Sequence, residues 1–170
     1  LDNGGGQMLS SSDTTISATE LSNVNGRINA LGNIDATLTN QLDNRAGQIN
    51  AYGTANLRAL TIDNGTGRIE AANLTINANT LRNGGGNVIA GNDAGIHANL
   101  DNSGGLVSAK HDLTLTAPAL NNAGGHLIGD NHLTVTTSSG NFGGILASAN
   151  AVTLTVNGDF TNTGLLSAQK

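Results

Sequence analysis

The stretch that decides the fold is a ten-residue unit, and residues 81–90 are a clear copy of it: Leu81-Arg82-Asn83-Gly84-Gly85-Gly86-Asn87-Val88-Ile89-Ala90. An apolar residue opens the unit, an asparagine follows two positions later, and a glycine comes three positions after the asparagine. The unit opens nine times, at Leu1, Leu21, Leu42, Ile62, Leu81, Leu100, Leu120, Ser139 and Phe160. The openings are 19 to 21 residues apart, and a fixed period of this length indicates a solenoid.

Each copy has a second half in which small or apolar residues alternate with polar ones. Leu113, Leu115 and Ala117 are one such triplet, and it usually begins thirteen positions after the opening. In the fourth copy the triplet begins one position early, at Leu74. Alternation with a period of two predicts a strand with one buried face. Each copy is therefore expected to hold two short strands joined by Gly/Asn turns.

The recurring asparagine has a physical explanation. Equivalent residues of successive coils lie about 4.8 Å apart, so a column of asparagines can bond amide to amide along the axis. Asparagine also tolerates the left-handed backbone region, and the recurring glycine marks a place where a side chain would collide. We expect a structural ladder made of Asn3, Asn23, Asn44, Asn64, Asn83, Asn102, Asn122, Asn141 and Asn162.

The composition excludes several classes of protein. Aromatic residues are 2% and charged residues 11% of the chain, which is too few of both for an ordinary globular domain. A net charge of −5 without a basic run argues against nucleic acid and anionic membrane as partners. Cysteine is absent, so disulfide and thiolate chemistry are excluded.

The repeat covers the whole length, so we expect one domain, 1–170, with no linker. The chain begins and ends within the pattern, and neither end resembles the atypical cap of a natural solenoid. This favours a segment of a longer array. Uncapped strand edges also predict self-association, because such edges template further pairing.

Residues 100–109, followed by 112–117, resemble the filamentous haemagglutinin repeat. That repeat builds the shafts of two-partner-secretion exoproteins, among them filamentous adhesins and contact-dependent growth inhibition toxins. The resemblance implies a right-handed parallel β-helix, here of about 8–9 coils of 19–21 residues. It also implies export through an outer-membrane transporter, a secreted or bacterial cell-surface location, and the rest of a parent filament as a partner.

Few residues are candidates for a catalytic or metal-binding site. None of the four histidines (His97, His111, His126 and His132) has a zinc-ligand spacing. Asp112 and His132 are expected to stack on adjacent coils and could pair, as surface residues rather than a catalytic pair. The acids are spread along the axis, whereas polysaccharide-cleaving sites need clustered carboxylates. We therefore expect no enzymatic activity, no cofactor and no metal site.

Other solenoid functions fit less well. Calcium-binding glycine-rich repeats need an aspartate at a fixed place after the glycines, and residues 83–87 lack it. Ice-binding solenoids carry a flat field of Thr-x-Thr motifs. Here three successive copies have one, but Asp35, Arg58 and His97 interrupt the rows earlier.

An outward row beside the first strand changes character along the chain. It is polar in the early copies, as at Arg27 and Glu70. In the later copies it becomes apolar, and the candidate interaction face consists of Ile89, Leu106, Ile128 and Ile145. An exposed apolar patch marks an interaction. The alternative is a one-residue register shift that buries these side chains.

The sequence thus predicts a mechanical shaft segment that extends a distal adhesive or toxic domain toward a target cell. The alternative is a side face that binds a glycan or protein receptor on that cell. Glycan binding favours exposed aromatic residues, and only Tyr52, Phe142 and Phe160 are available.

Overall fold

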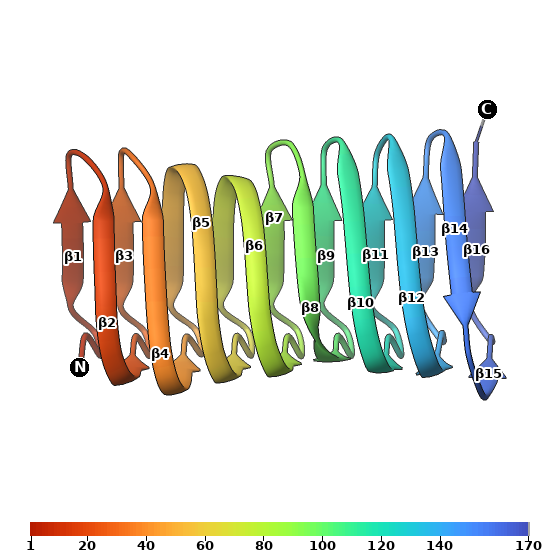
Figure 1. Cartoon of the computed structure of the whole chain (residues 1–170), viewed down its shortest axis with the longest axis horizontal. Helices are drawn as coiled ribbons and strands as arrows, with labels where there is room; N and C mark the ends of the chain where they lie inside the picture. The colour runs from red at the N-terminus through yellow and green to blue at the C-terminus, as the bar shows by residue number, and fades with distance from the viewer. Residues whose placement is uncertain (170) are drawn as a thin grey trace.

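The computed structural model describes residues 1–169, which form one β-solenoid (Figure 1). Its strands pair in parallel and make a single 16-stranded hydrogen-bonded sheet wound around the rod. In Figure 1 the chain rises at the back, crosses the top, descends at the front and advances to the right with each coil. This is a right-handed winding, so the expected right-handed parallel β-helix is confirmed. The described residues include no helix that is long and apolar enough to span a membrane.

Two kinds of strand alternate along most of the chain. The short strands are β1 Gln7–Ser10, β3 Arg27–Ala30, β7 Asn87–Ala90, β9 Leu106–Ala109, β11 His126–Gly129, β13 Ile145–Ser148, β15 Phe160–Thr161 and β16 Leu165–Ala168. The longer strands are β2 Thr14–Ser22, β4 Ile34–Asp43, β8 Ala94–Asp101, β10 Asp112–Asn121, β12 His132–Asn141 and β14 Ala151–Val156. In coils three and four both kinds merge into the continuous strands β5 Gln48–Asp63 and β6 Arg68–Arg82.

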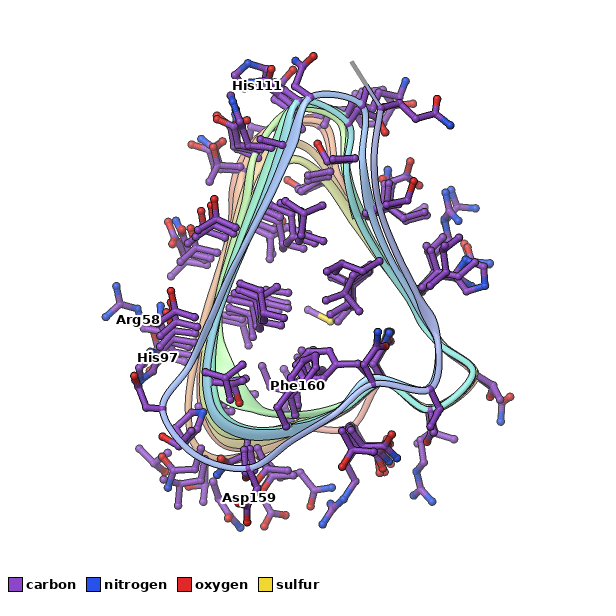
Figure 2. The ribbon with its side chains drawn as sticks, turned by 90° about the vertical axis from the view of Figure 1, so that its right-hand side faces the viewer. Arg58, His97, His111, Asp159 and Phe160 are labelled. Atoms are coloured by element: carbon purple, nitrogen blue, oxygen red, sulfur yellow. The ribbon has the colours of Figure 1, made fainter. Side chains whose placement is uncertain are left out.

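The coil has a triangular outline when it is viewed along the axis (Figure 2). The short strands other than β15, with the first part of β5 and β6, form the first face, whereas β15 pairs with the end of β12 on the third face. The longer strands bend and supply the second and third faces, and a register shift between Thr116 and Leu120 lies at such a bend. The corner between the third and first faces is a turn that begins at the recurring asparagine, as at Asn102.

The core is a thin aliphatic stack inside the triangle. On the first face Val88, Val107, Leu127 and Leu146 pair in one column and are at most 1% exposed. The triplets expected on the second face also point inward, and Leu113, for example, is fully buried. Because each coil buries this layer against its neighbours, the array needs no thick core.

The apolar row stays outside the core. Ile89, Leu106, Ile128 and Ile145 are half-buried and alternate with the buried column of the first face. They form two adjacent lines: Leu106 and Ile145 flank His126 in one, and Ile89 and Ile128 flank Ser108 in the other. The one-residue register shift is therefore excluded, whereas the role of the row as an interaction face stays a prediction.

Neighbouring residues on β11 test this register. A lysine in place of Leu127 would bury an unpaired charge, so we expect Leu127→Lys to cost about 3–5 kcal/mol of unfolding free energy. Ile128→Lys is the matched control, because its ammonium group can reach water, and it should change the unfolding free energy little. Chemical denaturation followed by circular dichroism measures both. Equal destabilisation by the two variants would contradict the assigned faces.

Candidate functional site

The buried asparagines form a continuous hydrogen-bonded column. Seven of them are at most 8% exposed: Asn3, Asn23, Asn44, Asn64, Asn83, Asn102 and Asn122. Each Nδ2 donates to the Oδ1 of the next asparagine at 2.7–2.8 Å, always toward the C-terminal coil. Nδ2 of Asn83 also donates to the carbonyl oxygen of Leu106 at 3.0 Å. The column therefore satisfies buried amides that would otherwise destabilise the corner.

The recurring glycine is required by close approach of the backbone. A Cβ on Gly86 would lie 2.1 Å from the carbonyl oxygen of Asn64 on the preceding coil, which is a collision. The left-handed backbone lies one residue earlier, as at Thr66 (φ 55°) and Gly85 (φ 63°). The ladder asparagines themselves do not adopt it, so their recurrence reflects the hydrogen-bonded column rather than tolerance of a positive φ.

The last two asparagines of the expected ladder lie outside the column. Asn141 and Asn162 are exposed, and the strand register pairs Asn141 with Asn121 and Gly140 with Leu120. The eighth coil therefore opens at Gly140 rather than Ser139, and Phe142 takes the ladder position. Its ring is 1% exposed and covers Gly140, where a Cβ would lie 2.4 Å from ring carbon Cε2. Because Phe142 offers no side-chain acceptor, the amide ladder ends at Asn122, whose Nδ2 donates to the carbonyl oxygen of Ile145 at 3.3 Å.

Removal of one ladder amide should destabilise the whole array. Asn83→Ala leaves Nδ2 of Asn64 without its side-chain acceptor and Oδ1 of Asn102 without its side-chain donor. We expect a loss of about 1–3 kcal/mol of unfolding free energy for Asn83→Ala, and a similar loss for Asn102→Ala. The exposed Asn141→Ala serves as the control. An unchanged denaturation midpoint for Asn83→Ala would show that the column contributes nothing to stability.

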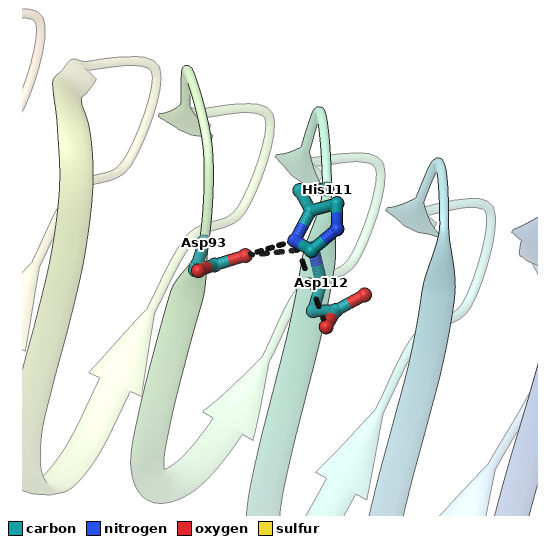
Figure 3. Close-up of side chains that lie close together, drawn as sticks. All are labelled: Asp93, His111 and Asp112. Carbon is teal, nitrogen blue, oxygen red and sulfur yellow. Dashed lines mark hydrogen bonds and ion pairs between the residues drawn. The ribbon is translucent and has the colours of Figure 1, made fainter.

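A second group of polar side chains gathers at the corner between the first and second faces (Figure 3). His111 Nδ1 lies 2.8 Å from Oδ1 of Asp93 and 3.6 Å from Oδ2 of Asp112. Asp93 precedes β8, His111 precedes β10, and Asp112 is the first residue of β10. The other oxygen of Asp112 lies 3.0 Å from His132 Nδ1 on the next coil.

The predicted pair of Asp112 and His132 is thus observed, and it is part of a larger cluster. Asp93 and His111 went unpredicted because they lie in turn residues between the two strand patterns. A usable signal existed, since Asp93 precedes Ala94 just as Asp112 precedes Leu113, and Ala94 pairs with Leu113. The other two histidines lie elsewhere, with His97 on the second face and His126 on the first.

Hydrogen bonding and nearby charge shift the pKa values of Asp93, His111 and Asp112. The hydrogen bond to Asp93, helped by the charge of Asp112, raises the pKa of His111 above its ordinary value. The same bond to His111 lowers the pKa of Asp93. Partial desolvation acts to raise the pKa of Asp112, but hydrogen bonds from Asn131 and His132 outweigh it and lower that pKa.

The cluster is a proton-binding group on an outer corner of the rod. Asp93, His111 and Asp112 offer one ligand atom each, all within 4.8 Å of one another, so they could hold a divalent cation. The side chains of Asp93 and His111 are 59% and 58% exposed. Water reaches both carboxylates and the imidazole, and that is unlike the dry pocket in which acid–base catalysts work.

The corner cluster has a defined pH dependence. A raised pKa means that folding strengthens proton binding by His111, so its contribution to stability is present below about pH 6.5 and disappears as the pH rises through the folded pKa. Asp93→Asn should lower the pKa of His111, measured by NMR titration of the imidazole. Asp35→Asn, on the second face, should leave it unchanged. An unaltered His111 pKa in Asp93→Asn would contradict the pairing.

The fold and the buried asparagine ladder define a class of protein: a β-solenoid built from one extended repeat. A family model described as the haemagglutinin repeat matches residues 1–41, 33–103, 89–164 and 143–170. The chain belongs to the haemagglutinin repeat family.

One curated relative carries a functional name. The chain is 42% identical over 82 residues to a protein named Toxin CdiA from Escherichia coli. The match covers 48% of this chain but only 3% of that protein, so it concerns a small part of a very long polypeptide. No solved structure matches the chain. Together, the repeat and this relative support a segment of a filament- or adhesin-type two-partner-secretion exoprotein.

Proposed function

We propose that this chain is a shaft segment, which holds a distal binding or toxin domain away from a bacterial surface. The observation that carries the proposal is the unbroken series of parallel strand pairs, from β1 paired with β3 to β13 paired with β16. Load along such a rod is shared by many backbone hydrogen bonds on every coil. The amide column adds side-chain bonds along the same axis.

The proposal places the segment in a larger secreted protein. Membership in the repeat family and the similarity to Toxin CdiA support export through an outer-membrane partner and display on a cell surface. In this role the segment itself performs no catalysis, and its contribution is length and stiffness. Any toxic activity belongs to other parts of the exoprotein.

A shaft should tolerate loss of a whole coil but not of part of one. Deletion of residues 83–101 joins Arg82 directly to Asn102. Arg82 pairs with Asp101 on the next coil, so it holds the equivalent position immediately before the ladder asparagine. Asn64 would then donate to Asn102 in place of Asn83. In the exoprotein that contains this segment, we expect surface display and target-cell activity to persist after this deletion.

Deletion of residues 83–92 is the matched control, because it removes about half a coil and interrupts both the column and the strand register. It should abolish display of the exoprotein, measured by antibody labelling of intact cells. Loss of activity after the whole-coil deletion, with display intact, would contradict the shaft role and favour a side face that recognises the target directly.

A further inference from the structure

A hollow of about 480 Å³ opens on the first face across coils two to six, within the range of small-molecule sites. Its lining combines residues of the first-face strands, such as Gln48 and Asn50, with one line of corner residues, each of which directly follows the first-face strand of its coil. Tyr52 stands at one end and Lys110 at the other, and Ala72 and Gly91 lie between them. Because those two side chains are so small, the surface is depressed between two long ones.

A shortened coil deepens the depression. The corner of coil four contains one residue fewer than that of coil three, and the strand register shifts between Ala51 and Thr54 to absorb the difference. This is the same shortening that brings the Leu74 triplet forward in the sequence. In Figure 1 the tops of β5 and β6 lie lower than those of the neighbouring coils.

The lining of the hollow concentrates positive charge. Three of the seven lysines and arginines of the chain contribute to it, although the chain carries a net charge of −5. Arg68 is paired with Glu70 at 2.8 Å. Among residues 1–169, no carboxylate lies within salt-bridge distance of Arg27 or Lys110. Two unpaired cations thus face a concave surface, where an anion would be attracted.

The remaining lining residues suit a sugar ring. Tyr52, the one tyrosine of the chain, is 67% exposed, and an aromatic ring presents a flat apolar face with a polar hydroxyl group. Gln48 and Asn50 add amides that can both donate and accept hydrogen bonds. Asn50 already donates to Asn29 at 2.8 Å, which leaves its amide oriented.

From this lining we propose that the hollow is a binding site for a saccharide that carries a carboxylate. The apolar face of the pyranose packs on Tyr52, the carboxylate lies toward Lys110, and hydroxyl groups bond Gln48 and Asn50. Tyr52 and Lys110 lie three coils apart, about 14 Å along the axis. The site is therefore short and closed at both ends, which favours one or two sugar rings over an extended acidic peptide.

A second groove of the rod lacks this combination. It runs over β8, β10 and β12 on the third face and has a volume of about 510 Å³. Its described lining includes no lysine, arginine or aromatic residue, and its charged members are Asp101 and Asp159. An acidic saccharide would therefore be repelled there, and this groove provides an internal comparison.

The test uses ¹⁵N-labelled protein titrated with the methyl glycosides of N-acetylneuraminic acid and glucuronic acid, two carboxylated sugars of different origin. We expect Kd values of about 1–10 mM for at least one of them, and shifts of the backbone amide signals around Tyr52, Ala72 and Gly91. The sugar that binds more tightly identifies the source of the carboxylate. Methyl galactoside, which lacks the carboxylate, should bind at least about fivefold more weakly.

Variants distinguish binding at the hollow from non-specific attraction of anions to the protein. Lys110→Ala and Tyr52→Ala should each weaken binding at least about fivefold, and Ala72→Gln should block the site by filling it. Arg58→Ala on the second face removes the same charge outside the hollow and should leave binding unchanged. The proposal is overturned by absence of binding, by equal binding of methyl galactoside, by equal weakening in Arg58→Ala, or by preference for a triglutamate peptide.

Discussion

The interaction on which the structure depends is the bond between buried side-chain amides of successive coils. Its length of 2.7–2.8 Å leaves no freedom in where each coil returns to the asparagine corner. Differences in coil length must therefore be absorbed elsewhere, and register shifts occur at the other corners, between Thr37 and Gln41 and between Ala51 and Thr54. The asparagine corner keeps its length in the first seven coils, where the amide column runs. In the eighth coil, where Phe142 replaces the amide, the corner between Gly140 and Ile145 is one residue shorter.

Much of this architecture could be predicted because it repeats. The inward triplets, the asparagine corner and the colliding glycine follow from period and residue type alone, and the resemblance supplied the handedness. The eighth coil could not be predicted by counting. Asn141 stands at the expected spacing, but the buried ring of Phe142 takes the ladder position and packs over Gly140. At this coil the packed register differs by one residue from the register predicted by the sequence period, and only the three-dimensional contacts show the difference.

The sites depend on residues that the repeat leaves free. Asp93 and His111 meet only because two turns stack, and Tyr52 faces Lys110 only because Ala72 and Gly91 are small. Of these residues only Asp93 could have been placed from the repeat, because it stands where Asp112 stands in the next coil. The others carry no periodic signal. Since the backbone ladders hold each coil in place, outward side chains can change without cost to the fold. A structural rod can therefore acquire binding surfaces along its sides.

The direction of the amide column makes the rod electrically polar. Every Nδ2 from Asn3 to Asn102 donates toward the C-terminal coil, so the side-chain dipoles align head to tail, as peptide dipoles do in a helix. The column begins at Asn3, and at its other end Nδ2 of Asn122 donates to the carbonyl oxygens of Gly125 and Ile145. The two ends of the rod are therefore chemically different, and the amide column has one fixed direction along the axis.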